Sequence, residues 1–528
     1  MNRPPQKATA DTPAVVSLKI STDDDPRVLK EQAQDDYANH VVPLTIRVGK
    51  WQLAMSIWSL LSAMIWLFYG ALVASLYGSV NAIIAMVAAV VAYSLLGALF
   101  SHWATRTGLN STLLSRQAFG ALGAVFIAVL VMVNTVYFAV FESSVVAVAF
   151  ASYTPNLPIE LWYGVVCLAM LPLMLGGVQT FMAKLNGALL PFFYIGLIIA
   201  IVVTAIRFPV GSAWLDFEGA VPPEARAYPG WLLGFTLYMG LFILLPTTVD
   251  FARFGKVEDD KFHMSVSFGW IFHTLLLLVN GVAGIFLVRS VIPNEAAAET
   301  GVVTAIIASI GVAGLVLIVL SQTRINTLNY YQASTNASRV ITSLTGLRVP
   351  RLFLVAALTV IVFLLMLTNV FSYLERMLGW QAAFMVGWVG VLVTHYVLTS
   401  GWRGTEFRAQ RMPRATAGLA VWILSAATAI WLEESSAAPE GLSTIAPLVT
   451  LLMSVVLYAI AFYLLRPRLS APAIDIRDEV TDPWREYVQC DACTKSYVAF
   501  EMDRDQHSPG LEPLCDACAI GQRSRRFA

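Results

Sequence analysis

Twelve apolar stretches, each long enough or nearly long enough to cross a bilayer, constrain this chain more than any other feature. The hydrocarbon core of a bilayer is about 30 Å thick, and a helix of about 20 apolar residues spans it. Because lipid offers the backbone no hydrogen-bond partners, such stretches must form helices rather than open strands. The sequence therefore predicts an all-α polytopic membrane protein with twelve transmembrane helices. The predicted spans are 51–76, 79–103, 121–150, 159–178, 187–206, 229–249, 266–290, 301–323, 352–372, 379–400, 415–432 and 444–465.

Along the chain, loops rich in basic residues alternate with loops that are poor in them. By the positive-inside rule, loops rich in lysine and arginine face the cytoplasm. An even number of spans then places both termini in the cytoplasm, with the chain integral to the cell membrane or an inner membrane. The basic loops hold Arg106, Arg116, Lys184, Arg253, Lys256, Lys261, Arg339, Arg348, Arg351, Arg403, Arg408, Arg411 and Arg414.

Composition and charge narrow the class further. Only 13% of the 528 residues are charged, whereas soluble domains carry about 25%. The 34 basic and 34 acidic side chains cancel, so the charge predicts no nucleic-acid partner. Residues 1–45 are polar and mixed in charge. We expect them to form a disordered cytoplasmic tail ahead of a membrane domain at 46–466.

Glu142 is the clearest ionisable residue within a predicted span. Charged side chains inside a membrane are costly, so they are candidates for function. Deep in the third span, this carboxylate is placed to accept hydrogen bonds from a substrate N–H group or to carry a coupled proton. The alternative is a carboxylate near a helix end that reaches water or is capped by a serine.

A polar run from Ser321 to Ser338 surrounds the end of the eighth predicted span. Gln322, Asn326 and Asn329 fall on one helical face. Their amides offer donors and acceptors together, which suits a neutral heterocycle with both kinds of edge. The alternative is a polar cytoplasmic extension of the helix.

Aromatic side chains in the first, third and sixth spans are candidates to stack on a flat ligand. The alternative for each of them is an ordinary lipid-facing or interfacial position. The candidates are Trp58, Trp66, Tyr137, Phe141, Tyr238 and Phe242.

The order of the spans permits an internal repeat. Because five is an odd number, spans 1–5 and 6–10 insert in opposite senses, which allows a binding site at the midplane between two broken helices. Candidate unwinding points are Ser56, Ser59 and Ser62 in the first span and Gly234, Gly240 and Pro246 in the sixth. An even-numbered, loop-poor bundle without a cluster of catalytic residues favours a transporter over an enzyme, with channels and receptors as alternatives.

Several phrases resemble those of the nucleobase–cation symporter-1 family, the purine–cytosine permeases. They lie at the expected places between spans and extend the resemblance over residues 40–466. The phrases are Val42-Pro43, Ser115-Arg116 with Phe119-Gly120, Asp250-Phe251 with Arg253-Phe254, and the run from Gln322 to Ser334.

The resemblance implies a LeuT-like fold of five plus five inverted-repeat helices with two extra helices. It implies alternating-access import of a nucleobase or related small heterocycle, of cytosine, purine, allantoin or hydantoin type, driven by sodium or protons. The stacking and hydrogen-bonding roles fall on Tyr137, Phe141, Glu142, Tyr238 or Phe242, and Asn326 or Asn329.

Arg324 departs from the pattern expected of a sodium-coupled carrier. It lies close to Ser321 and Thr323, the hydroxyls that would complete a sodium site in the family. A guanidinium there would repel sodium and could replace it, which leads to the hypothesis of proton coupling through Glu142 or of sodium-independent transport. The alternative is that Arg324 is simply the first basic residue of a cytoplasmic loop.

After residue 466 the composition changes sharply. A linker rich in proline and charge at 467–486 precedes Cys490-Asp-Ala-Cys493 and, after 21 intervening residues, Cys515-Asp-Ala-Cys518. Two Cys-x-x-Cys pairs at this spacing indicate a four-thiolate zinc site, predicted to be structural because four sulfurs leave no open position. A rubredoxin-like iron site and a redox dithiol pair are the alternatives.

The predicted zinc module comprises residues 487–528 and is too small to bury much core, so the metal would supply much of its folding energy. His507 is expected to be a loop residue rather than a ligand. The basic end from Arg523 to Arg526 suits membrane lipid headgroups or an acidic cytoplasmic partner. Two other readings remain: a transporter-derived ligand sensor that signals through the zinc module, and an amino-acid or amine carrier of the same fold.

Overall fold

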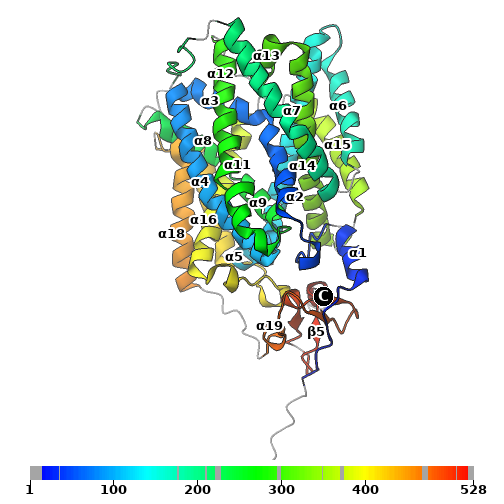
Figure 1. The fold of residues 1–528 in the computed structure, drawn as a ribbon. Helices are drawn as coiled ribbons and strands as arrows, with labels where there is room; N and C mark the ends of the chain where they lie inside the picture. The colour runs from blue at the N-terminus through cyan, green and yellow to red at the C-terminus, as the bar shows by residue number, and fades with distance from the viewer. Residues whose placement is uncertain are drawn as a thin grey trace, which may run out of the picture.

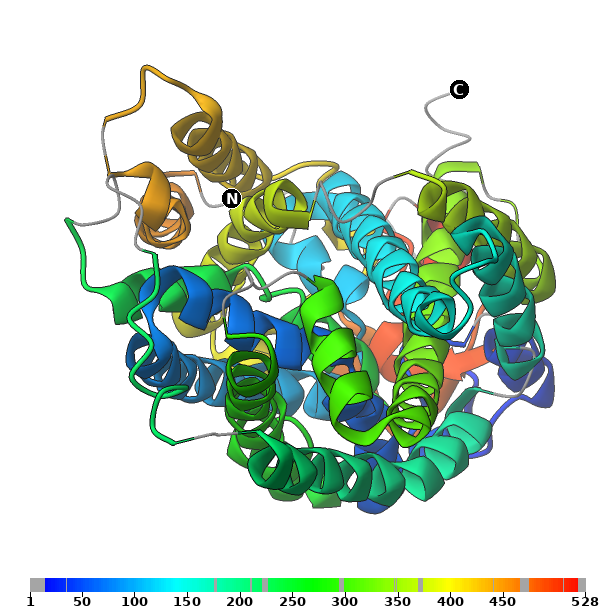
Figure 2. The same cartoon turned by 90° about the horizontal axis from the view of Figure 1, so that it is seen from above.

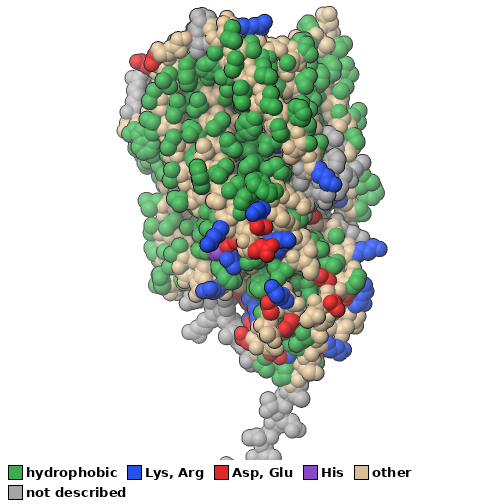
Figure 3. Space-filling view, viewed as in Figure 1, with side chains coloured by type: hydrophobic (Ala, Val, Ile, Leu, Met, Phe, Trp, Pro, Cys, Tyr) green, Lys and Arg blue, Asp and Glu red, His purple; other side chains and the backbone are tan. Residues whose placement is uncertain are grey.

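The computed structural model describes residues 15–34, 36–174, 178–208, 211–220, 227–293, 299–345, 347, 349–368, 374–439, 441–465, 474–506 and 508–520. A long bundle of helices forms most of the molecule, and the C-terminal residues lie at one end of it (Figure 1). On the face shown in Figure 3, hydrophobic side chains cover the bundle, whereas most charged side chains gather at the end that carries the C-terminal residues. We call this end the module end.

Seven helices in the described ranges are long and apolar enough to cross a membrane, and two bent helix pairs raise the number to nine. Among the other predicted spans, α6 and α15 are apolar but only 16 residues long, and α14 is long but polar. The chain is therefore a multi-pass membrane protein, and the count of twelve spans remains a prediction.

The first five predicted spans correspond to four continuous helices and one bent pair. The pair comes first, with α2 and α3 joined by the short 3₁₀ helix η2. The elements are α2 Lys50–Ile57, η2 Trp58–Ser62, α3 Met64–Tyr77, α4 Ser79–Thr107, α5 Ser111–Tyr153, α6 Ile159–Met174 and α7 Val178–Arg207.

Serine side chains accompany the break between α2 and α3, which bends the pair by 47°. The Ser59 hydroxyl donates to the Ser56 carbonyl at 3.0 Å, and the Ser62 hydroxyl donates to the Ser59 carbonyl at 3.1 Å. Such local bonds offer the backbone an alternative to the helical ladder. The Trp66 indole N–H donates to the Leu60 carbonyl at 2.6 Å. The break therefore falls at serines that the sequence marks as unwinding points.

The next five predicted spans begin with a second bent pair, which runs in the opposite direction to the first (Figure 1). The pair α8–α9 bends by 46° at residues 240–243. At this break the Gln381 amide donates to the Gly240 carbonyl at 2.8 Å. The elements are α8 Gly230–Met239, α9 Leu244–Ala252, η4 Val257–Asp259, α10 Asp260–Phe262, η5 His263–Ser267, α11 Trp270–His273, η6 Thr274–Val279, α12 Asn280–Val291, α13 Glu299–Ile310, α14 Val312–Thr345, α15 Arg351–Met366 and α16 Leu374–Leu398.

The eighth predicted span has different boundaries in the structure. Residues 301–323 belong to two helices, because α13 ends at Ile310 and α14 starts at Val312 after Gly311 in the left-handed conformation. At 34 residues, α14 is about 50 Å long. The polar run from Ser321 to Ser338 therefore lies within this helix, not beyond it. All but one of its residues are buried in the structure.

The last two predicted spans pack beside α16 at the edge of the bundle (Figure 2). Gly120 shapes this edge, because its φ of 79° interrupts α5 and places its backbone against Ala415. A Cβ there would lie 2.8 Å from the Ala415 Cα atom. The elements are η8 Gly401–Gly404, η9 Ala409–Arg411, α17 Ala417–Glu434, η10 Ser443–Ile445 and α18 Ala446–Leu464.

Both ends of the chain contribute to a small unit at the module end. Strand β1 of the N-terminal residues pairs antiparallel with β2, and β2 pairs with β3. The sequence predicts disorder in this tail, but the described part of it contains a strand. The partner strand lies more than 460 residues away, so no local pattern in the sequence indicates the pairing. The elements are β1 Ile20–Ser21, α1 Pro26–Gln34, η1 Leu44–Ile46, α19 Ile476–Glu479, β2 Tyr487–Gln489, β3 Ser496–Val498, η11 Ala499–Glu501, β4 Asp503–Arg504 and β5 Pro513–Leu514.

Residues 474–506 and 508–520 form what we call the module. Its core includes Val28 from α1 and Ile476 from α19. The predicted linker 467–486 therefore differs from the structure in its second half, where Trp484 stacks on Phe500 at 3.9 Å between ring centroids. Residues 466–473, His507 and the basic end 523–526 lie outside the described residues.

Candidate functional site

A buried cavity of about 40 Å³ lies where the two bent helix pairs meet α5 and α14. Its wall combines one carboxylate, two amides and two hydroxyls with aromatic and aliphatic side chains. The lining residues are Leu60, Ala63, Ile65, Trp66, Thr135, Phe138, Glu142, Leu241, Ile243, Leu244, Thr247, Ile325, Leu328, Asn329 and Gln332.

Glu142 is the ionisable residue of this wall and is 1% exposed. The Gln322 side-chain amide of α14 donates to its carboxylate. The backbone N–H of Ile65 donates to it as well. Ile65 lies in the first turn of α3, directly after the break, so the carboxylate sits at the positive end of that helix. Free N–H groups and the helix dipole make such an end a site for negative charge.

The amides of α14 form a chain across the wall. Asn329 donates to the Asn326 side-chain oxygen at 3.4 Å, and Asn326 donates to the Ser143 hydroxyl at 3.1 Å. Asn329 lines the cavity itself, whereas Gln322 and Asn326 support it from behind. Gln332, one turn further on, also lines the cavity and accepts a hydrogen bond from the Thr247 hydroxyl at 3.2 Å.

The aromatic side chains on the wall differ from most of those that the sequence suggests. Phe138 lines the cavity, whereas the preceding residue, Tyr137, does not and packs in part against a cluster that includes residues of α6 and α15. One residue along a helix turns a side chain by about 100°, so neighbours face different partners. Trp66 also lines the cavity.

The remaining predicted aromatics lie outside the wall. Phe141 contacts Phe68 of α3 at 6.3 Å between ring centroids. Tyr238 packs on Tyr69, and Phe242 meets Tyr93 of α4 edge-on at 5.2 Å. These rings join the bent helices to the rest of the bundle. Trp58 ends α2, and its carbonyl takes part in the Arg324 contact described next.

Arg324 is fully buried on α14, facing the break of the first bent pair. It donates to the Trp58 carbonyl at 3.0 Å. Ser321 donates to the Ser62 carbonyl at 2.6 Å from the same helix. Thr323, the third predicted coupling residue, is half-buried. The junction between α14 and the break thus holds a positive charge and a serine hydroxyl on backbone carbonyl groups of the break.

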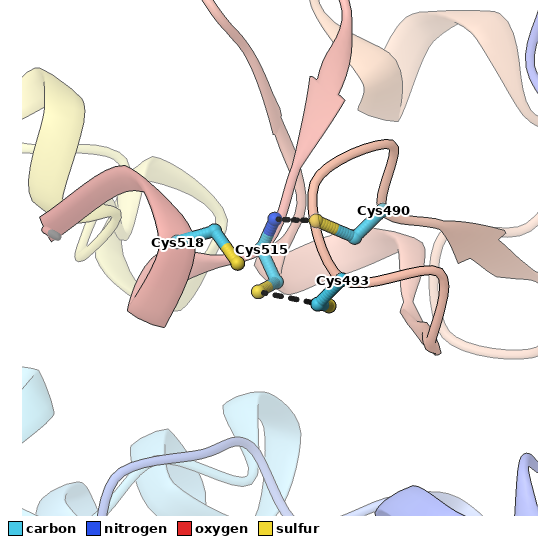
Figure 4. Close-up of side chains that lie close together, drawn as sticks. All are labelled: Cys490, Cys493, Cys515 and Cys518. Atoms are coloured by element: carbon cyan, nitrogen blue, oxygen red, sulfur yellow. Dashed lines mark hydrogen bonds between the residues drawn. The ribbon is translucent and has the colours of Figure 1, made fainter. Parts of the chain in front are cut away.

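Four thiols gather in the module. The Sγ atoms of Cys490, Cys493, Cys515 and Cys518 all lie within 4.8 Å of one another. Figure 4 shows two of them on the turn after β2 and two at the short helix that follows β5. Hydrogen bonds from the Cys515 thiol and from backbone N–H groups lower the pKa of Cys490 to about 5. Thiolates are the form in which cysteine binds metal ions.

The module is bound to the membrane helices by ion pairs. Arg116 at the start of α5 pairs with Asp516 at 2.8 Å. In the loop before α17, Arg408 pairs with Asp475 at 2.7 Å and Arg411 pairs with Asp503 at 2.7 Å. The sequence places these arginines in basic cytoplasmic loops but gives no sign of their partners.

Two bent helix pairs in opposite senses around a buried polar cavity define the fold. This is the LeuT-type fold of five plus five inverted-repeat membrane transporters, as the sequence predicts. No protein-family profile and no curated protein matches the chain.

Solved structures match this fold over most of their length. Mhp1 in an inward-facing conformation gives a TM-score of 0.64 at 14% identity, covering 80% of this chain and 92% of Mhp1. A second structure of Mhp1, a nucleobase-cation-symport-1 family transporter, shows it in a closed conformation with bromovinylhydantoin bound. It gives a TM-score of 0.59 at 15% identity, covering 82% of this chain and 96% of Mhp1. A manganese transporter of Eremococcus coleocola gives 0.52 at 14%, covering 80% and 98%. A Na⁺-coupled sialic acid symporter gives 0.52 at 11%, covering 82% and 91%. Each of these neighbours is a transporter, and the likeness establishes the fold of this chain.

Proposed function

We propose that the chain is a secondary active transporter that imports a nucleobase-like heterocycle by alternating access. The observation that carries the proposal is Glu142, buried in the wall of the central cavity at the end of a broken helix. Inverted-repeat transporters bind their substrates at such midplane breaks. The shared fold with Mhp1 supports this reading. The basic loops favour an orientation with both termini in the cytoplasm.

The chemistry of the wall favours a flat ligand with N–H and carbonyl edges. The Glu142 carboxylate accepts hydrogen bonds, and the Asn329 amide both donates and accepts. Trp66 and Phe138 offer faces for stacking. A cavity of about 150 Å³ holds benzene, so the present volume of about 40 Å³ has to widen before a ring enters. Such widening is expected of a carrier that alternates between states.

A thermal-shift screen tests this proposal. The purified protein is tested with cytosine, uracil, hypoxanthine, allantoin, hydantoin and several amino acids. A ligand at a hundredfold its Kd stabilises the folded state by about 3 kcal/mol. We expect one heterocycle to raise the melting temperature in wild type and in Glu160→Gln, a control at the start of α6, but not in Glu142→Gln. A shift with an amino acid alone would contradict the nucleobase proposal.

Arg324 supports sodium-independent coupling, with Glu142 as the proton carrier. Its guanidinium already bonds to the Trp58 carbonyl, an oxygen of the kind that sodium requires, and its charge repels a second cation. We expect wild-type binding to be unchanged by sodium at fixed pH. In Arg324→Gln the charge is gone, and sodium is expected to raise the melting temperature. Sodium-dependent binding by the wild type would overturn this assignment.

We propose zinc as the metal of the four-cysteine site. Tetrahedral coordination with zinc–sulfur bonds of 2.3 Å implies sulfur–sulfur separations of about 3.8 Å. The Sγ atoms of Cys493 and Cys515 lie 4.0 Å apart, and all four lie within 4.8 Å. The fit favours one ion bound by all four thiolates. Elemental analysis of the purified full chain tests this, with one zinc per chain expected and none in Cys490→Ser.

A further inference from the structure

The N-terminal residues connect the module to the transport helices. On one side they belong to the module, because β1 pairs with β2 and Val28 lies in the module core. Lys495 also pairs with Glu31 of α1. The following residues, 36–41, leave the module and reach the helices of the bundle. We call residues 36–41 the latch.

The latch contacts elements of both repeats at the module end. Arg253, at the end of α9, donates to the Tyr37 carbonyl at 2.7 Å and to the Asp36 carbonyl at 2.8 Å. Tyr331 of α14 donates its hydroxyl to the Asp36 carboxylate. Asn110, before α5, donates to the Ala38 carbonyl at 2.7 Å. One short segment therefore holds α9, α14 and α5 together.

The backbone of the latch is held in an uncommon conformation. Asp36 and Tyr37 have φ angles of 53° and 56°, in the left-handed region that non-glycine residues seldom occupy. Such strain persists only where the surroundings enforce it. The buried Arg253 guanidinium bonds to both of their carbonyls, which fixes this turn against the end of α9. Loss of these contacts would release both the strain and the helix end.

Glu501 of the module keeps the latch in place. Its carboxylate accepts a hydrogen bond from the Val41 backbone N–H at 3.1 Å and lies 3.4 Å from the His40 ring nitrogen. The His40 ring stacks on Tyr497 of β3, with 5.7 Å between centroids. Glu501 is 3% exposed, so these contacts are shielded from water.

The four thiols are part of the structure that presents Glu501. Strands of two and three residues cannot form a stable sheet alone. Cys490 and Cys515 belong to the module core, and Cys490 directly follows the strand that pairs with β1. A module this small depends on its metal for folding. Loss of the metal would therefore unpair β1 and free the latch.

We propose that metal at the four-cysteine site slows transport by holding the latch against the helices at the module end. We call this effect the brake. The proposal rests on the transport function proposed above, because elements of the two repeats must move relative to one another for that end to open. The metal is a thiophilic divalent cation such as zinc. With the metal bound, the latch keeps the three helices together, and the carrier opens to the module end less often.

Hydrogen exchange of the full chain in detergent tests the brake without any substrate. The zinc-loaded protein is compared with protein treated with a zinc chelator. We expect amide exchange to accelerate about tenfold at residues 36–42 and 250–255 and in α14 from 328 to 339, with α17 and α18 unchanged. Acceleration confined to residues 487–520 would overturn the proposal, because the module would then unfold without affecting the helices.

A variant that keeps the metal separates the brake from simple unfolding. Glu501→Ala removes the contacts of the module carboxylate with His40 and Val41 but none of the sulfur ligands. We expect it to retain one zinc per chain and to speed exchange at 36–42 and 250–255 about tenfold, the size expected for a lost charge-assisted hydrogen bond. Glu512→Ala is the matched control on the same module, where the Glu512 carbonyl bonds to Asp505. Equal exchange in Glu501→Ala, Glu512→Ala and wild type would contradict the brake.

Uptake into proteoliposomes completes the test. If a substrate is found, Glu501→Ala is expected to transport it severalfold faster than wild type. Slower uptake with accelerated exchange would mean that the module supports transport instead of restraining it, which overturns the brake but leaves the transporter proposal intact. Failure of every heterocycle to bind would instead refute the proposed substrate class and leave the exchange result standing.

Discussion

At the scale of single residues, the central cavity depends on which side of a helix each residue faces. The sequence identifies the third span and its carboxylate, because an apolar run interrupted by one Glu is easily recognised. It cannot choose between Tyr137 and Phe138, because both are aromatic and helical spacing alone fixes no absolute rotation. Only the packing of α5 against α14 and the two breaks turns Phe138 inward.

This pair of neighbours gives a direct prediction. Phe138→Ala removes a ring from the cavity wall, so we expect the thermal shift of a bound heterocycle to fall by an amount that corresponds to about tenfold weaker binding. Tyr137→Ala changes a ring outside the wall and is expected to leave the shift of that ligand unchanged. The measurement is the shift at several ligand concentrations. If Tyr137→Ala has the larger effect, the assignment of the wall is wrong.

At the scale of helices, the structure differs most from the sequence in α14. Hydropathy ends the eighth span at 323, because Gln322, Asn326 and Asn329 resemble the start of a polar loop. In the structure their amides bond to α5 or to one another, so polarity is buried in protein rather than exposed to lipid. A hydropathy analysis therefore ends this span too early, because it cannot tell buried polar groups from a polar loop.

The contact between α3 and α12 gives a prediction about stability. A Cβ on Gly70 would lie 2.3 Å from the Gly281 carbonyl oxygen. Because backbone cannot move aside cheaply, we expect Gly70→Ala to destabilise the protein by about 1–3 kcal/mol. Gly164→Ala is the control, since its nearest atom would be 3.8 Å away. The melting temperatures of the two variants decide the matter, and equal values would count against this close packing.

At the scale of the whole molecule, the two termini and the membrane bundle meet through charged side chains. The four-cysteine cluster is predicted from spacing alone, because two Cys-x-x-Cys pairs have few other uses. The docking of the module on the bundle cannot be predicted from the sequence, since the partners of Arg408, Arg411 and Arg116 lie 64–400 residues away along the chain. Contacts over such separations leave no local pattern.

Glu406 makes this docking sensitive to acid. Burial alone would raise its pKa, but the charges of Arg477, Arg408 and Arg411 lower the pKa from 4.5 to about 2. A carboxylate with a depressed pKa stabilises the folded state above its ordinary pKa, and this contribution is lost as the pH falls from 4.5 toward 2. The shift corresponds to about 3 kcal/mol.

We expect Glu406→Gln to loosen the docked module at neutral pH. The substitution leaves all four cysteines of the module in place. Hydrogen exchange at residues 474–506 reports the change, and wild type should approach the same behaviour as the pH is lowered below 4.5. Exchange in Glu406→Gln equal to that of wild type at pH 7 would show that the carboxylate does not support docking.

The most direct measurement of the transport account is uptake into proteoliposomes under separately imposed gradients. The radiolabelled probes are cytosine, hypoxanthine, allantoin and hydantoin. The account predicts accumulation of one of them under a proton gradient without sodium, and no accumulation by Glu142→Gln under the same gradient. Accumulation that requires a sodium gradient at fixed pH, or that is unchanged in Glu142→Gln, would contradict it.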